Sequence, residues 1–195
     1  MKHVRIFAAV LFVLLSLSPL AAQTRAERDR GFMFEIGLGL GKPVYDPATA
    51  SVFDLLDADP TITHVTVGLD LGLGYAIGPK SYLILRASGV GDRYEDSIDF
   101  LQMNLYLYSI EGRFYPFTTG LFLEGGIGAS RAVLQDSVYG TSSTDFGTGA
   151  GLGLGYEFSS RKTGFTLAVK VRVMTLTIEG DVESAGMALL CLTWK

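Results

Sequence analysis

Residues 64–78, HVTVGLDLGLGYAIG, alternate between two kinds of side chain. Apolar residues occupy every odd position from Val65 to Ile77, whereas half of the even positions are glycine, with Asp70 among the others. Seven consecutive apolar positions at a period of two indicate a β-strand with one apolar face. This stretch therefore predicts a sheet protein whose two faces meet different surroundings.

The same alternation recurs along the rest of the chain. Turn residues divide it into eight segments that we expect to be strands: 31–43, 62–78, 81–92, 99–115, 120–135, 146–158, 164–179 and 184–194. Short turns such as Gly78-Pro79-Lys80 alternate with longer acidic connections, of which residues 44–61 are the longest, and we expect these to be loops. The pattern predicts an all-β fold, an eight-stranded antiparallel up-and-down β-barrel.

The segment 99–115 departs once from the alternation. Its first apolar residues, from Leu101 to Leu107, fall on odd positions, but Ile110 and Phe114 fall on even ones. This change predicts either a β-bulge near Ser109 or a misassigned face.

The composition excludes several classes of protein. The chain has 195 residues, of which 48% are hydrophobic and 18% are charged, and its formal net charge is −4. A chain this apolar is not disordered, and without a basic excess no nucleic-acid partner is expected. Cys191, the single cysteine, cannot form an internal disulfide and is expected to be a packing residue.

The N-terminus has the layout of a secretory signal peptide. Lys2 and Arg5 begin it, residues 6–15 are apolar, and small residues lead to Ala22. Ten apolar residues are too few for a membrane-spanning helix, which needs about 20. We expect a signal peptide at residues 1–22, cleavage near Ala22, and one barrel domain at residues 23–195.

The character of the two faces decides which solvent each one meets. A soluble barrel would cover its outer face with charge, but here the second face is mostly glycine with isolated ionisable residues, which suits a narrow lumen. The apolar set, including Leu69, Leu152 and Val171, is therefore expected to contact lipid. Strands of about 9–11 residues suffice to cross a bilayer, and a closed barrel leaves no backbone edge unpaired. We predict a monomeric transmembrane barrel.

Nine ionisable residues fall on the lumen face, towards the short-turn end. Because an unpaired buried charge is very costly, we predict that they form one ion-pair network. An eight-stranded interior is just wide enough for side chains to fill, which favours structural filling over a gate or conduction path. The nine residues are Glu35, Asp70, Arg86, Glu111, Arg113, Glu124, Glu157, Lys170 and Arg172.

The lumen face changes character towards the long loops. Apolar residues there could form a site for a small hydrophobic ligand, or they could simply pack beneath the loops. We expect Gln102, Asn104 and Tyr106 to share this region with them. The six candidate ligand-site residues are Ile84, Val90, Met174, Leu176, Met187 and Leu189.

Motifs for catalysis, cofactors and metals are mostly absent from the sequence. The glycines follow a G-x-G-x-G pattern without a following helix, and there is neither an H-E-x-x-H motif nor a cysteine pair. We therefore expect no cofactor, no metal and no enzyme. His64 lies on the lumen face at a loop end, so a rim-histidine lipid-modifying enzyme is the weakest of three functional hypotheses.

Two stretches, residues 111–129 (EGRFYPFTTGLFLEGGIGA) and 186–195 (GMALLCLTWK), carry a resemblance to a known family. The chain resembles the small eight-stranded outer-membrane β-barrels, which include OmpX, the OmpA membrane domain and OmpW. The resemblance implies a bacterial outer-membrane location and a final strand, with Leu190, Leu192 and Trp194, that the barrel assembly machinery recognises; here Lys195 follows the terminal aromatic residue.

The same resemblance implies two functions. Similarity to OmpX implies a structural or surface-interaction role, which we predict here together with a plugged lumen. Similarity to OmpW implies the alternative, a narrow conduit for small hydrophobic molecules.

Overall fold

The computed structural model describes residues 31–117, 120–158 and 164–195, so the expected signal peptide lies outside the described residues. The described residues form eight long strands, one short strand and one helix: β1 (Phe32–Val44), α2 (Pro47–Asp57), β2 (Thr63–Gly78), β3 (Ser81–Glu95), β4 (Phe100–Phe114), β5 (Leu121–Asp136), β6 (Gly140–Ser143), β7 (Gly147–Glu157), β8 (Phe165–Ile178) and β9 (Asp181–Trp194). Within these ranges, no helix has the length and apolarity needed to cross a membrane.

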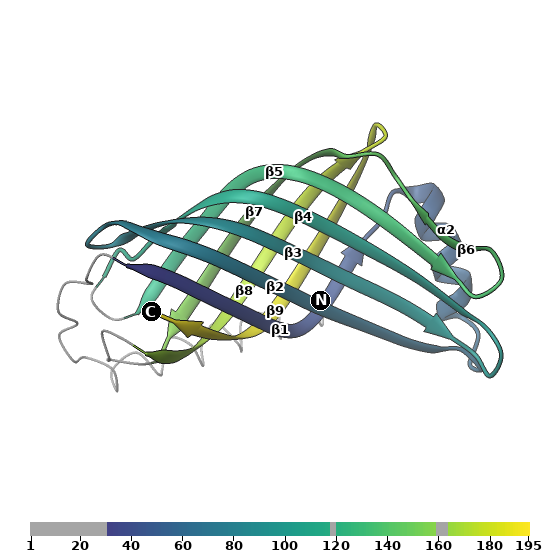
Figure 1. Ribbon diagram of the computed structural model, residues 1–195. Helices are drawn as coiled ribbons and strands as arrows, with labels where there is room; N and C mark the ends of the chain where they lie inside the picture. The colour runs from purple at the N-terminus through teal and green to yellow at the C-terminus, as the bar shows by residue number, and fades with distance from the viewer. Residues whose placement is uncertain (1–30, 118–119, 159–163) are drawn as a thin grey trace.

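The eight long strands form a closed antiparallel barrel, which confirms the predicted fold class (Figure 1). Each strand pairs with its neighbours in sequence, and β1 pairs with β9 to close the circle. The short strand β6, which the sequence did not predict, pairs with residues 133–136 of β5. Figure 1 shows β6 and α2 at the end of the barrel opposite the C-terminus.

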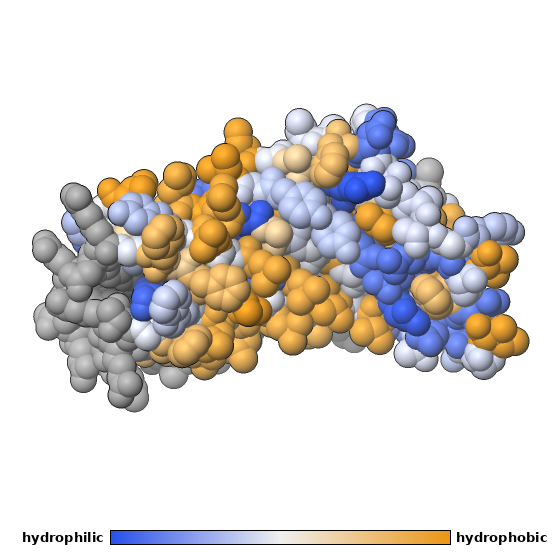
Figure 2. Space-filling model, viewed as in Figure 1, coloured by the Kyte–Doolittle hydropathy of each residue, from blue (hydrophilic) through white to orange (hydrophobic). Residues whose placement is uncertain are grey.

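The outer surface of the barrel is apolar along its middle. Figure 2 shows hydrophobic side chains in a band between the C-terminal end of the barrel and the loop end. Leu69 and Leu152 are 52% and 65% exposed, although both belong to regular strands. Exposed aliphatic side chains all around a closed sheet are typical of a barrel that meets acyl chains.

The predicted bulge in β4 is wrong. Register is unbroken along β4 on both sides, and Leu105, Leu107 and Ser109 all point inward with Glu111. The interior above the charged residues needs apolar filling, so these leucines take inward positions. Tyr106 was expected in the lumen, but it pairs across from Gly89 on the outer face.

Gln102 and Asn104 were also expected in the lumen, and this prediction is wrong as well. They share the outward register with Tyr106 at the loop end of β4, and Gln102 Nε2 donates to Asn104 Oδ1 at 2.8 Å. Polar residues on the outer face at this height indicate that the strand end rises above the apolar belt.

The expectation that residues 44–61 form a loop throughout is also wrong, because α2 occupies Pro47–Asp57. Asp46 is its N-cap, with Oδ1 accepting from the Thr49 N–H at 3.4 Å, and Pro47 follows at the first helical position. The capping residue and the proline were a readable helix signal.

Glycine is required where β5 approaches β4 closely. A Cβ at Gly126 would lie 2.0 Å from the Ile110 carbonyl oxygen, and one at Gly128 would lie 1.9 Å from that of Tyr108. Backbone atoms cannot move away as a flexible side chain can, so a larger residue would separate the two strands. These glycines therefore keep the barrel narrow at the level of its charged residues.

Candidate functional site

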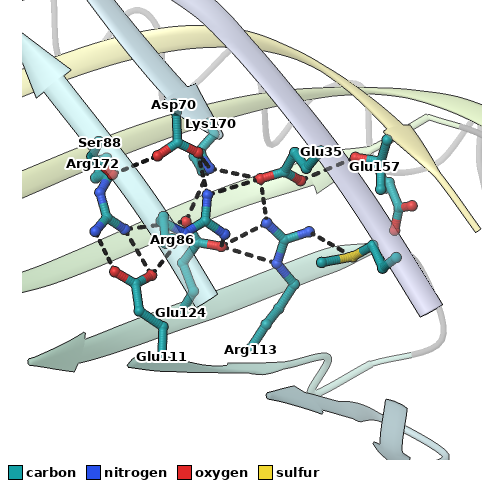
Figure 3. A network of polar contacts seen from close by, with 12 residues as sticks. Glu35, Asp70, Arg86, Ser88, Glu111, Arg113, Glu124, Glu157, Lys170 and Arg172 are labelled. Carbon is teal, nitrogen blue, oxygen red and sulfur yellow. Dashed lines mark hydrogen bonds and ion pairs between the residues drawn. The ribbon is translucent and has the colours of Figure 1, made fainter. Parts of the chain in front are cut away.

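Eight charged side chains from six strands meet inside the barrel, and we call them the charged floor (Figure 3). None is more than 4% exposed. Four are carboxylates and four are cations, so the charges balance. The members are Glu35, Asp70, Arg86, Glu111, Arg113, Glu124, Lys170 and Arg172.

Two residues connect the whole charged floor. Arg86 contacts all four carboxylates: Glu35 at 3.0 Å, Glu111 at 2.9 Å, Glu124 at 3.0 Å, and Asp70. Glu124 contacts all four cations, at distances that run from 2.7 Å to Arg113 to 3.5 Å to Arg172. Since each is shared by every residue of opposite charge, neither can be removed without leaving several partners unbalanced.

Hydroxyl groups complete the coordination of the carboxylates. Ser88 Oγ donates to Asp70 Oδ1 at 2.6 Å, Ser109 Oγ to Glu111 Oε1 at 2.5 Å, and Thr193 Oγ1 to Glu35 Oε2 at 3.0 Å. Burying ions is compensated only when their remaining hydrogen-bonding positions are also satisfied. Hydroxyl groups from β3, β4 and β9 meet this condition for three of the four carboxylates. Among the described residues, Arg86 Nε and Arg172 Nε have no partner in hydrogen-bond geometry, although Arg86 Nε lies 2.9 Å from Glu111 Oε2.

Glu157, the ninth predicted member, is not part of the charged floor. Its carboxylate pairs with Lys195 and accepts from Thr166 Oγ1 at 2.9 Å. Sequence reasoning missed Lys195 because it follows the last strand and was not assigned to either face. This pair, beside the ring of Tyr115, lies at the short-turn end of the lumen.

All six candidate ligand-site residues lie buried in one apolar cluster, five of them on the loop side of the charged floor, whereas Ile84 lies two residues nearer the β2–β3 turn than Arg86, on the short-turn side. None is more than 3% exposed, and Leu105 and Leu107 pack with them. We call the seven residues on the loop side the apolar layer: Val90, Leu105, Leu107, Met174, Leu176, Met187 and Leu189. The two leucines come from the loop-end half of β4, where the sequence analysis assigned the inward face wrongly.

A second polar cluster, which sequence reasoning did not predict, lies at the loop end of the lumen. His64 Nδ1 lies 2.8 Å from Asp57 of α2, and its Nε2 lies 2.5 Å from the buried Asp92. Tyr45 donates to the other oxygen of Asp92 at 2.8 Å. Both ring nitrogens of His64 therefore lie within hydrogen-bond distance of a carboxylate oxygen.

Aromatic rings complete this cluster. Phe53 of α2, 5% exposed, lies between Tyr45 and Tyr94, with ring centroids 4.6 and 5.2 Å away. Tyr94 in turn stacks on His64 at 4.1 Å. We call these six residues the rim latch: Tyr45, Phe53, Asp57, His64, Asp92 and Tyr94. Through it, side chains hold α2 against the barrel rim.

Glu183 at the loop end of β9 makes a further contact to the segment before α2. Its Oε2 accepts the Asp46 N–H at 3.1 Å. Partial burial and the nearby Asp46 carboxylate raise the pKa of Glu183 to about 7. Within the described ranges, no group of three or more His, Cys, Asp or Glu is arranged to hold a metal ion.

The three residues expected to carry the assembly signal lie on the outer face of β9. Leu190, Leu192 and Trp194 are each about half exposed and alternate with inward-facing residues. Trp194 pairs across from Phe34 of β1 and Phe165 of β8, so aromatic residues gather where β9 closes the barrel.

Residues 7–188 match the family described as "Outer membrane protein beta-barrel domain". The chain belongs to this family. It is accordingly a barrel protein of the bacterial outer membrane, where membrane lipid surrounds it. A search among curated proteins finds no match.

Solved structures of other outer-membrane barrels share the fold. Ail, the attachment invasion locus protein of Yersinia pestis, solved with the heparin analogue sucrose octasulfate, is 15% identical with a TM-score of 0.55, covering 85% of this chain and 99% of Ail. The Neisserial surface protein A (NspA) is 11% identical with a TM-score of 0.54, covering 86% of this chain and 99% of NspA. At these identities the likeness supports the fold alone.

Proposed function

We propose that this protein is a monomeric outer-membrane barrel with a plugged lumen, whose role is structural or surface interaction. The observation that carries the proposal is the charged floor, in which Arg86 and Glu124 each bind every opposite charge. A conducting path normally presents an excess of one charge to its ion. Here four positive and four negative groups neutralise one another.

Three successive obstacles support the plugged state. The charged floor fills the lumen from six strands, the apolar layer follows it, and α2 packs on the rim above. Water and ions would have to separate buried ion pairs and then cross a hydrophobic layer, and both steps are costly.

Conductance in planar bilayers tests this proposal. The unmodified protein should be silent, whereas Arg86→Ala/Glu124→Ala, which removes two large side chains without changing net charge, should open a path and give discrete currents. Asp145→Asn on an exposed loop is a control that should stay silent. Discrete openings of the unmodified protein, lost when Arg86 or Arg113 is replaced, would contradict the plug.

The apolar layer supports a second candidate, a narrow conduit for small hydrophobic molecules. Its residues offer an apolar surface such as a hydrophobic solute requires. Uptake of a small uncharged fluorescent dye into dye-free proteoliposomes tests it. Uptake above that of empty liposomes, abolished by Leu189→Arg, would favour the conduit; equal uptake would leave the structural role.

We further propose that residues 1–22 are a signal peptide cleaved near Ala22, and that the barrel assembly machinery recognises the outward face of β9. N-terminal sequencing of the mature protein should begin at Gln23. Trp194→Ala should reduce the amount of folded protein in the outer membrane, whereas the exposed loop change Tyr139→Ala should not.

A further inference from the structure

A groove lies between three parts of the loop end. It has a volume of about 270 Å³, and it is formed by the end of α2, the β3–β4 hairpin and the β5–β6 turn. Sites that enclose a small molecule have about 300–1,000 Å³. A smaller, open groove better suits one or two side chains of a larger partner.

Apolar side chains provide much of the surface of this groove. Leu56 and Ile62 contribute from one side, and Phe100, Leu101 and Val138 from the others. Val138 is 67% exposed, and Ile98 and Tyr139 on the adjoining turns are 85% and 90% exposed. Such groups on polar loops beyond the membrane belt favour contact with another molecule.

The two turns that border the groove are held in place by their own carboxylates. Asp96 Oδ1 accepts the N–H groups of Ile98 and Asp99 at 2.7 and 2.8 Å, and Asp136 accepts those of Val138 and Tyr139. Ser137 Oγ joins the turns by donating to Asp99 Oδ1 at 2.8 Å. The groove is therefore formed before any partner binds, which reduces the entropy cost of binding.

The charge around the groove selects the partner. Asp96, Asp99 and Asp136 line it, and among the described residues no Lys, Arg or His lies within 4.0 Å of their oxygens, whereas Glu95 is paired with Arg93. Backbone hydrogen bonds lower the pKa of Asp96, so it is charged at neutral pH. Three unbalanced carboxylates repel anions and attract cations.

We propose that this groove docks a cationic amphipathic peptide segment. An apolar side chain of the peptide lies against Leu56, Ile62 and Leu101, and its Lys or Arg residues face the three carboxylates. The proposal rests on the surface-interaction role proposed above and names the chemistry of the partner. It joins an apolar contact, which supplies affinity, to flanking charges, which supply specificity.

Binding of a model peptide tests the proposal. The probe is a fluorescent amphipathic peptide of Lys and Leu, titrated against the full chain in phosphatidylcholine nanodiscs, with empty nanodiscs as background. We expect saturable one-to-one binding that weakens as ionic strength rises. A matched peptide with Glu in place of Lys should not bind.

A pair of triple variants separates the groove from general charge. Asp96→Asn/Asp99→Asn/Asp136→Asn keeps the accepting Oδ1 atoms of the turns but removes three charges, and should weaken binding about tenfold. Asp145→Asn/Glu179→Gln/Asp181→Asn removes three charges from other exposed loop positions and should leave the affinity unchanged. Ile62→Thr should weaken binding while keeping all charges.

Equal affinity of the two triple variants, or equal binding of the Glu peptide, would overturn the proposal. The outcome is independent of the plug, because bilayer conductance reports the lumen and peptide binding reports the loops. Heat-modifiable migration of every variant on detergent gels shows that the barrel is folded before binding is compared.

Discussion

The charged floor and the rim latch are both polar clusters inside one barrel, but their surroundings differ. The floor is sealed within the strands, with every side chain at most 4% exposed. The latch sits at the loop end, where the His64 side chain is 34% exposed and Asp57 49%. The charges of the floor connect barrel strands with one another, whereas those of the latch connect the helix α2 to the barrel.

This difference teaches which cluster can change without unfolding the protein. Floor residues come from strands whose hydrogen bonds close the barrel, so their separation requires the barrel to open. The helix α2 touches the barrel mainly through side chains and can leave it as a local unit. The variants below are designed to break or sharpen this contrast.

The largest effect is expected for Arg86→Met. It leaves four carboxylates without their common partner, which should lower the free energy of unfolding by about 3–5 kcal/mol. Urea unfolding in detergent, followed by gel mobility, measures this. Arg86→Met/Glu124→Leu restores charge balance, so its loss should be smaller than the sum of the two single losses; additive losses would contradict the network.

A smaller, local effect is expected for Phe53→Ala. Loss of a buried phenylalanine should weaken docking of α2 by roughly 1.5–3 kcal/mol, and hydrogen exchange in the helix should accelerate about 10- to 100-fold. Leu55→Ala is the control on the same helix, because Leu55 is 75% exposed. If the free energy of barrel unfolding fell by as much as the free energy of α2 docking, the helix would not be a separable unit.

The docking of α2 should also depend on pH. The pKa of Glu183 is raised from its ordinary 4.5 to about 7, so the docked state favours the neutral acid. This contribution is fully present below about 4.5 and is lost as pH rises through about 7. A spin label at Leu55→Cys, in a Cys191→Ala background, should become more mobile across this range.

Glu183→Gln supplies the control for that titration. It removes the part of the pH dependence carried by Glu183 and leaves any part carried by other groups. Identical mobility curves for the two proteins would show that Glu183 does not control α2.

The smallest effect is expected for Glu95→Gln. Arg93 Nε lies 2.8 Å from Glu95 Oε2, as close as many pairs in the charged floor, but the two side chains are 38% and 52% exposed. Water and salt screen such a pair, so the free energy of unfolding should change by no more than about 0.2–1 kcal/mol. A loss of unfolding free energy as large as that of Arg86→Met would mean that burial does not determine how much an ion pair contributes to stability.

The sequence was sufficient for the barrel because alternation is a local signal repeated in eight strands. It also placed the floor residues on the inward face, since a period of two assigns each residue to one side. It failed where the two faces are alike in polarity. Leu105 and Leu107 are apolar inside the apolar layer, so their chemistry resembles that of lipid-facing residues.

The rim latch could not be predicted, because it depends on the position of α2. His64 and Asp92 are neighbours across β2 and β3 only through register. Phe53 reaches Tyr94 from a connection that we expected to be a loop. The Asp46 cap and Pro47 predict a helix, but nothing local predicts where a helix in a connection will dock.

The shared contacts of Arg86 and Glu124 limit how this barrel can evolve. A single charge change in the floor leaves several partners unpaired at once, so most single substitutions there produce a poorly assembled protein. Compensating changes must arise together on different strands. The interior should therefore diverge slowly and in correlated groups, while the loops that meet the outside can vary residue by residue.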